Sequence, residues 1–150
     1  MNDDEPVAIL EQNRIMAIST VRPDGWPQTT IVGYASDGFV LYFLIFRASQ
    51  KFANISADDR VSVAIGQEPR DLREAKAVYA GAFAAEVVSP TEREHAWRLL
   101  MARHPNLSGT PMPDVSQTAL MRAECRHVSV IDYSKGLGHA DALHLPQGTR

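Results

Sequence analysis

Hydrophobic and polar positions form their clearest pattern in the middle of the chain. Residues 39–46 (FVLYFLIF) are an almost unbroken apolar run, which is typical of a strand covered on both faces. Residues 50–57 have the spacing of a short helix, and Ser49 before them is a favourable N-cap residue. Residues 61–65 (VSVAI) follow as a second buried strand. The pattern therefore predicts a strand, a short helix and another strand.

The N-terminal part predicts one helix followed by a hairpin of two strands. Pro6 follows three acidic residues, which suits a helix start, and we expect a helix over residues 6–12. Residues 14–21 and 27–35 are rich in apolar and β-branched side chains. The Pro-Asp-Gly turn between them is a strong hairpin signal. A second tight turn at residues 36–38 then leads into the central strand.

The second half predicts a longer alternation of strands, loops and one helix. We expect a loop at residues 67–74, a strand at 76–88 and a helix at 90–104. A second loop at residues 107–116 and a final strand at 118–133 follow. Gly81 in the middle of the first of these strands suggests a bulge or bend. Ser89, Pro90 and Glu92 give the N-cap, first-turn proline and acidic third position of a helix start.

The summed pattern predicts a mainly β protein with flanking helices. Six strands with antiparallel neighbours and one glycine bend favour a small closed barrel over an open parallel sheet. We expect a single domain over residues 1–133. The tail, residues 134–150, shows no hydrophobic periodicity, so we expect it to be partly disordered or to close a site.

Composition and charge narrow the classes of partner. The 150 residues carry a net charge of −3 and are 45% hydrophobic, which is ordinary for a globular domain and argues against non-specific nucleic-acid binding. No apolar run approaches the ~18 residues of a membrane span, and the N-terminus lacks a signal-peptide pattern. A lone cysteine, Cys125, excludes an internal disulfide. We therefore expect a cytoplasmic protein that binds neither nucleic acid nor membrane.

Three polar residues alternate where the central strand passes into the short helix. Arg47, Ser49 and Lys51 bring a guanidinium, a hydroxyl and an ammonium to a helix N-terminus, where backbone N–H groups are unpaired. Such a corner suits a phosphate monoester. The alternative is that the two cations are solvated and the serine only caps the helix. The five histidines do not fall at metal-ligand spacing, so the sequence predicts no metal site.

Several segments together resemble one known family. The segments DGWP, TIVGY, RASQKFANI and DDRVSVAI occur in order between residues 24 and 65. They resemble the pyridoxamine 5′-phosphate oxidase-like superfamily, the flavin-binding split barrels. The resemblance extends over residues 9–88 and, less fully, over 128–133. It implies a six-stranded antiparallel split β-barrel that forms a homodimer and binds FMN in clefts between the protomers.

The resemblance also assigns expected roles to individual residues. It implies that Arg47, Ser49 and Lys51 hold the FMN phosphate. Residues lining the flavin from the second strand would be Gln28, Thr29, Thr30, Ile31 and Val32, with backbone amides approaching its ring. Lys76 and Tyr79 would reach the cofactor from the partner protomer. The implied activity is hydride or electron transfer to or from a small molecule that the sequence does not identify.

The C-terminal segment departs from the oxidase itself, so vitamin B6 oxidation is not assigned. In place of the expected arginine- and histidine-bearing segment, the chain reads DYSKGLGHADAL. Lys135 and His139 there either close the flavin site or belong to a mobile terminus. Three alternatives to an FMN enzyme stay open. They are a deazaflavin-dependent reductase of the same fold, a non-catalytic flavin- or haem-binding module, and a structural dimer without ligand.

Overall fold

The structure, a computed structural model, describes residues 2–146. Three α-helices are present in these residues: α1 (Asp4–Gln12), α2 (Gln50–Ala57) and α3 (Pro90–Arg103). The strands are β1 (Ile15–Val21), β2 (Pro27–Gly33), β3 (Ala35–Asp37), β4 (Val40–Phe46), β5 (Arg60–Gly66), β6 (Lys76–Glu86), β7 (Thr118–Asp132) and β8 (Ala140–His144). No helix of the described residues is long and apolar enough to cross a membrane.

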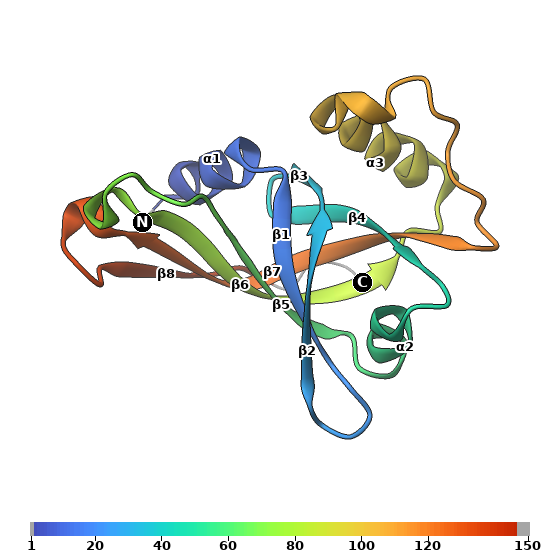
Figure 1. Ribbon diagram of the computed structural model, residues 1–150, viewed down its shortest axis with the longest axis horizontal. Coiled ribbons are helices and arrows are strands. Elements are labelled where there is room, and N and C mark those ends of the chain that lie inside the picture. The colour runs from blue at the N-terminus through green and yellow to red at the C-terminus, as the bar shows by residue number, and fades with distance from the viewer. Residues whose placement is uncertain (1, 147–150) are drawn as a thin grey trace.

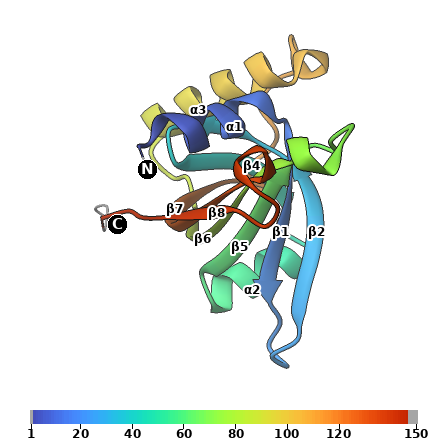
Figure 2. The same cartoon turned by 90° about the vertical axis from the view of Figure 1, so that its left-hand side faces the viewer.

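All eight strands join one antiparallel sheet that curls into a half-barrel (Figure 1). Their order is β2-β1-β5-β6-β7-β4-β3, with β8 added to β7. Among the described residues β2 does not pair with β3, so the sheet does not close. The expected closed barrel of six strands is therefore wrong in both closure and strand count. Helices α1 and α3 lie at one end of the sheet and α2 lies at the other (Figure 2).

The first additional strand comes from the segment expected to be a tight turn. Ala35–Asp37 pairs with β4 as β3, and the turn itself falls one residue later, where Gly38 has a φ of 58°. Tyr34 separates β2 from β3, because its phenolic OH donates to the Leu10 carbonyl at 2.6 Å and holds the chain against α1. A break of one residue was not visible in the sequence pattern.

The second additional strand corrects the expectation for the tail. Gly136 and Gly138 adopt φ values of 135° and 80°, which lets the chain reverse and return along β7 as β8. Leu143 and Leu145 pack against the main core. Both leucines are partly buried, whereas Ala142 and His144 beside them are exposed, which is the alternation of a strand with one face on the core. Residues 140–144 therefore form a strand that the sequence pattern did not predict, and residues 147–150 lie outside the described part.

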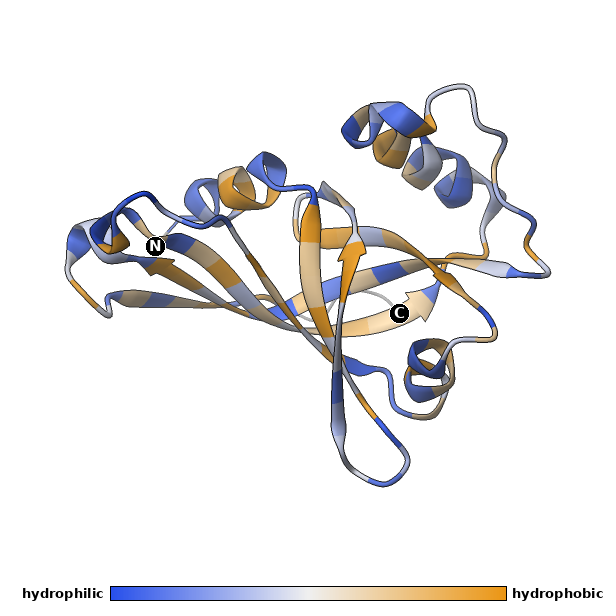
Figure 3. Ribbon diagram, in the orientation of Figure 1, coloured by the Kyte–Doolittle hydropathy of each residue, from blue (hydrophilic) through white to orange (hydrophobic). Residues whose placement is uncertain are grey.

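Two apolar clusters hold the sheet and helices together. The main cluster gathers buried side chains from the strands and from Ile9 and Leu10 of α1. Hydrophobic and hydrophilic residues alternate along much of the strands (Figure 3), as expected where every second side chain faces the core. The second cluster lies between α3 and β4, where Trp97 and Leu100 pack with Tyr42 and Leu120. Trp97 is therefore a core residue.

A β-bulge in the longest strand pair changes which side chains face outward. Gly81 on β6 is opposite His127, and the next residue, Ala82, is opposite Cys125. Arg126 on β7 is thus the extra residue, which confirms the bulge expected at Gly81 and places the insertion on the neighbouring strand. Burial raises the pKa of the Cys125 thiol to about 12, so this cysteine is held as the neutral thiol.

Candidate functional site

The turn from β4 into α2 has the capped geometry that the sequence predicts. Ser49 Oγ accepts from the Phe52 N–H at 3.1 Å and donates to the Phe46 carbonyl at 2.6 Å. Helix α2 begins at Gln50, as expected. In a capped helix the amides of the first two residues, Gln50 and Lys51, have no acceptor within the helix. This corner therefore presents two N–H groups outward.

Lys51 is the cation of this corner that lacks an acidic partner. Its Nζ donates to Thr30 Oγ1 on β2 at 3.1 Å, so the side chain lies between α2 and β2. Burial lowers the pKa of Lys51, and no carboxylate of the described residues offsets this effect. A half-buried ammonium with only a hydroxyl beside it gains from an added anion.

Arg47 has a different environment, because an acidic side chain already binds it. Its two terminal nitrogens donate to the carboxylate oxygens of Glu86 at 2.8 Å and 2.5 Å, and its Nε donates to the Val115 carbonyl. The guanidinium also lies over the Phe52 ring at 5.5 Å. Two of its five N–H groups remain for another partner. No local pattern predicts this ion pair, because Glu86 is 39 residues away in the sequence.

The five expected flavin-lining residues of β2 divide between the two faces of the strand. Gln28, Thr30 and Val32 point inward and are partly buried, whereas Thr29 and Ile31 point outward and are exposed. This division follows from the two-residue period of a strand. The five side chains therefore cannot all face one ligand.

The backbone of β2 offers polar groups along a free edge. Among the described strands, β2 pairs with β1 alone. The bonds from Arg22 N to Trp26 O (3.0 Å) and from Tyr34 N to Arg14 O (2.9 Å) direct the even-numbered residues of β2 toward β1. The N–H and C=O groups of Thr29 and Ile31 consequently point away from β1, beside the Thr30–Lys51 contact.

A buried asparagine, which sequence reasoning did not select, joins α2 to this hairpin. Asn54 Nδ2 donates to Thr20 Oγ1 and to Gln28 Oε1, both at 3.0 Å, and its Oδ1 accepts from Gln50 Nε2 at 2.8 Å. All of its strong hydrogen-bonding groups are used, which fixes α2 against β1 and β2. The four-residue spacing of Gln50 and Asn54 was the only signal in the sequence.

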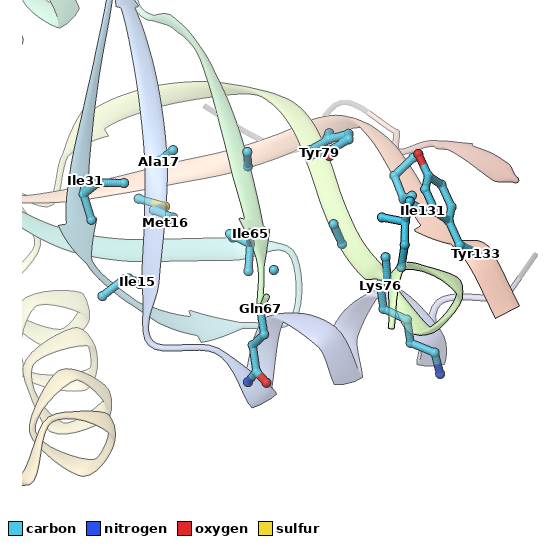
Figure 4. A pocket seen from close by; sticks show the side chains of 15 residues that line it. Ile15, Met16, Ala17, Ile31, Ile65, Gln67, Lys76, Tyr79, Ile131 and Tyr133 are labelled. Atoms are coloured by element: carbon cyan, nitrogen blue, oxygen red, sulfur yellow. The ribbon is translucent and has the colours of Figure 1, made fainter. Parts of the chain in front are cut away.

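Lys76 and Tyr79 lie elsewhere on the protomer, in a groove on the outer face of the sheet (Figure 4). The groove has a volume of about 460 Å³ and runs from Ile15 and Ile31 to Tyr133. Tyr79, at 48% exposure, lies toward its middle. No hydrogen bond or ion pair within the described residues joins Lys76 or Tyr79 to the corner around α2.

The two tail residues considered for site closure bind acidic partners within the chain. Lys135 Nζ lies 3.2 Å from a carboxylate oxygen of Glu5 on α1, which raises the pKa of Lys135. His139 Nε2 lies 3.1 Å from Asp141 Oδ2 on β8. The Lys135–Glu5 contact joins the reversed tail to α1, and the His139–Asp141 contact lies within the tail. A role of either residue in closing a site stays a prediction.

A curled antiparallel half-barrel with a capped helix after β4 is the architecture of the split-barrel class. The sequence profile of the pyridoxamine 5′-phosphate oxidase family matches residues 3–132. The chain therefore belongs to the pyridoxamine 5′-phosphate oxidase family. No curated protein matches the sequence significantly.

Solved structures share the fold at low sequence identity. A haem-binding protein from Mycobacterium smegmatis superposes with a TM-score of 0.79 at 16% identity, over 96% of this chain and 58% of its own. A conserved hypothetical protein from Mycobacterium tuberculosis gives 0.75 at 22% identity, over 99% and 93%. An FAD-binding protein from Mesorhizobium loti gives 0.69 at 22%, over 87% and 94%. The chain thus spans 58% of the length of the M. smegmatis protein.

Proposed function

We propose that the protein is an FMN-dependent oxidoreductase that works as a homodimer. It transfers hydride or electrons between a reduced donor and a small molecule. The observation that carries the proposal is the half-buried Lys51 ammonium at the open N-terminus of α2, whose one hydrogen bond within the described residues goes to Thr30. Membership of the pyridoxamine 5′-phosphate oxidase family supports it.

The corner around α2 fits a phosphate group. Lys51 supplies a charge, and the amides of Gln50 and Lys51 supply N–H donors at the positive end of the helix dipole. Hydrogen bonds to a charged group contribute roughly 1.5–3 kcal/mol each, so three of them can support micromolar binding before ordering costs. Arg47 adds two N–H groups while Glu86 holds it in place. Ser49 acts through the helix, which it caps.

The free edge of β2 fits the polar rim of a flavin ring. Outward N–H and C=O groups at Thr29 and Ile31 alternate as donor and acceptor, which suits an edge carrying both imide and carbonyl groups. Bound FMN would supply the redox reactivity, while the chain binds it, orients it and excludes water. The partly buried side chains of β2 pack on the inner side of the sheet and hold this edge in place; they are Gln28, Thr30 and Val32.

A second copy of the chain is the proposed partner. Ile15, Ile31 and Leu72 are 58%, 64% and 63% exposed around the groove on the outer sheet face. Covering these apolar side chains is favourable. In such a dimer, Lys76 and Tyr79 of one protomer approach the cofactor of the other, which is why they lie apart from Lys51 within one chain. The expected cytoplasmic location stays a prediction.

The test begins with the small molecule that copurifies with the protein. Mass spectrometry after gentle denaturation identifies FMN, a deazaflavin or haem directly, and haem is included because a structural neighbour is a haem-binding protein. We expect FMN at about one per protomer and its reduction by a nicotinamide donor in steady-state assays. If mass spectrometry finds a different cofactor, the FMN part of the proposal is wrong and that cofactor takes its place. FMN without turnover against any acceptor makes the protein a binding module.

A further inference from the structure

Two histidines far apart in the sequence form a direct cross-strand pair. His127 on β7 is opposite His144 on β8 in the strand register. Their Nδ1 atoms lie 3.0 Å apart, and the two rings meet edge to face with centroids 5.2 Å apart. Both side chains are exposed. Two imidazole nitrogens thus meet at the solvent-facing surface of the sheet.

The β-bulge creates this pair. Before the bulge the odd-numbered residues of β7, such as Ala123 and Cys125, point into the core. After it the even-numbered residues do so, beginning with Val128. If β7 alternated regularly through Arg126, with no bulge, His127 would follow Cys125 by two residues and would face the core, out of reach of His144. The position of the pair therefore depends on a specific irregularity of the backbone.

The separation of the two nitrogens fits two ligands of one metal ion. With metal–nitrogen bonds of about 2.0–2.1 Å, two cis ligands lie about 2.9 Å apart at a right angle and about 3.3 Å apart at a tetrahedral angle. The observed 3.0 Å lies within this span. Without metal the same distance suits one Nδ1–H donating to the other Nδ1. In the metal-bound form both rings carry their proton on Nε2.

We propose that His127 and His144 form a chelating site for a divalent transition-metal ion of the kind that prefers imidazole, such as Zn²⁺. No group of three or more metal-ligating side chains occurs in the described residues, so two protein ligands leave the remaining positions open to water. The ion joins the edge strand β8 to β7. The site lies apart from α2 and does not depend on the proposed flavin chemistry.

Titration with Zn²⁺ alone, followed by calorimetry at neutral pH, tests the site. The variants are His127→Gln and His144→Gln. His139→Gln is the matched control, because it removes a histidine that neighbours β8 and contacts Asp141 instead. Histidine ring signals in nuclear magnetic resonance spectra report which rings the metal contacts.

We expect one Zn²⁺ per chain, with shifts at His127 and His144. Because losing even a residue that supports a metal ligand costs roughly 10–100-fold in affinity, each ligand variant should lose more than tenfold. The His139→Gln protein should bind as the wild type does. Equal affinity in all four proteins, or no binding at millimolar Zn²⁺, overturns the proposal. The His144→Gln variant lies on the edge strand, so it serves if His127→Gln disturbs the sheet.

Discussion

At the scale of single residues, the two cations near α2 are not equivalent. Glu86 neutralises Arg47 through two hydrogen bonds, whereas the hydrogen-bond partner of Lys51 in the described part of the chain is the Thr30 hydroxyl. A bound phosphate would therefore change the electrostatic environment of Lys51 more than that of Arg47. The sequence placed both residues at the corner correctly. It could not rank them, because the acidic partner comes from a strand that lies far away in the chain.

The Arg47–Glu86 pair should make the free energy of unfolding depend on pH in the acidic range. Hydrogen bonding from Arg47 lowers the pKa of Glu86 below its usual 4.5. Since the folded-state pKa lies below the unfolded value, the pair stabilises the fold above that value and loses its effect as pH falls through the lowered pKa. We predict that Glu86→Gln is less stable than wild type at pH 7 and that the difference shrinks as the pH falls through the lowered pKa of Glu86. Urea unfolding at several pH values measures this. A constant difference at all pH values would contradict it.

Ser49 allows its capping role to be separated from ligand binding. We predict that Ser49→Ala lowers the free energy of unfolding by about 1 kcal/mol, because the Phe52 N–H loses its acceptor. Ser49→Asp keeps a cap and should retain most of that stability, while its negative charge weakens FMN binding. Thermal unfolding and FMN titration of both variants measure the two effects. Unchanged stability in Ser49→Ala would show that the cap is not needed.

At the scale of elements, local signals predicted most of the fold and failed where the determinant is distant. Helix α2 occupies the residues expected, because its cap and its apolar spacing lie within the segment itself. The bulge was expected at Gly81 for the same reason. Strand β8 was missed because it is stabilised by pairing with β7 and by two leucines in the core, and neither is a property of the tail alone.

The tail gives an element-scale prediction with an internal control. Leu143 packs against the core from β8, while Leu137 in the preceding turn is 70% exposed. We predict that Leu143→Ala costs about 1–2 kcal/mol, less than a fully buried leucine would. Leu137→Ala should stay within about 0.5 kcal/mol of wild type. Chemical denaturation compares them. Equal effects would mean that β8 does not contribute to the stability of the sheet.

At the scale of the whole molecule, the site at α2 and the groove around Tyr79 belong to different surfaces of one protomer. The cofactor-binding residues implied by the resemblance are divided between these two surfaces. In the proposed dimer, a ligand that contacts Lys51 of one chain meets Tyr79 of the other. Strand alternation could have separated the outward from the inward residues of β2 in advance. The curvature of the sheet, which sets the two surfaces apart, depends on pairings that no single segment encodes.

The dimer proposal predicts that assembly and cofactor binding fail together. Ile15→Glu places a charge in the apolar groove and should convert the dimer to monomer, with loss of FMN affinity. Val88→Glu is the control, because Val88 is 78% exposed and does not line the groove. Analytical ultracentrifugation and FMN titration give the two readouts. A wild-type monomer that binds FMN fully would contradict the dimer.

The central claim, that Lys51 and the start of α2 bind the phosphate of FMN, is tested most directly by comparing FMN with riboflavin. These ligands share the flavin ring and differ in the phosphate. Wild-type protein should prefer FMN, and Lys51→Ala should weaken FMN binding at least tenfold, which corresponds to about 1.4 kcal/mol, with riboflavin binding unchanged. Arg60→Ala, beyond the other end of α2, should alter neither affinity. Equal losses for both ligands, or none for FMN, would contradict the claim.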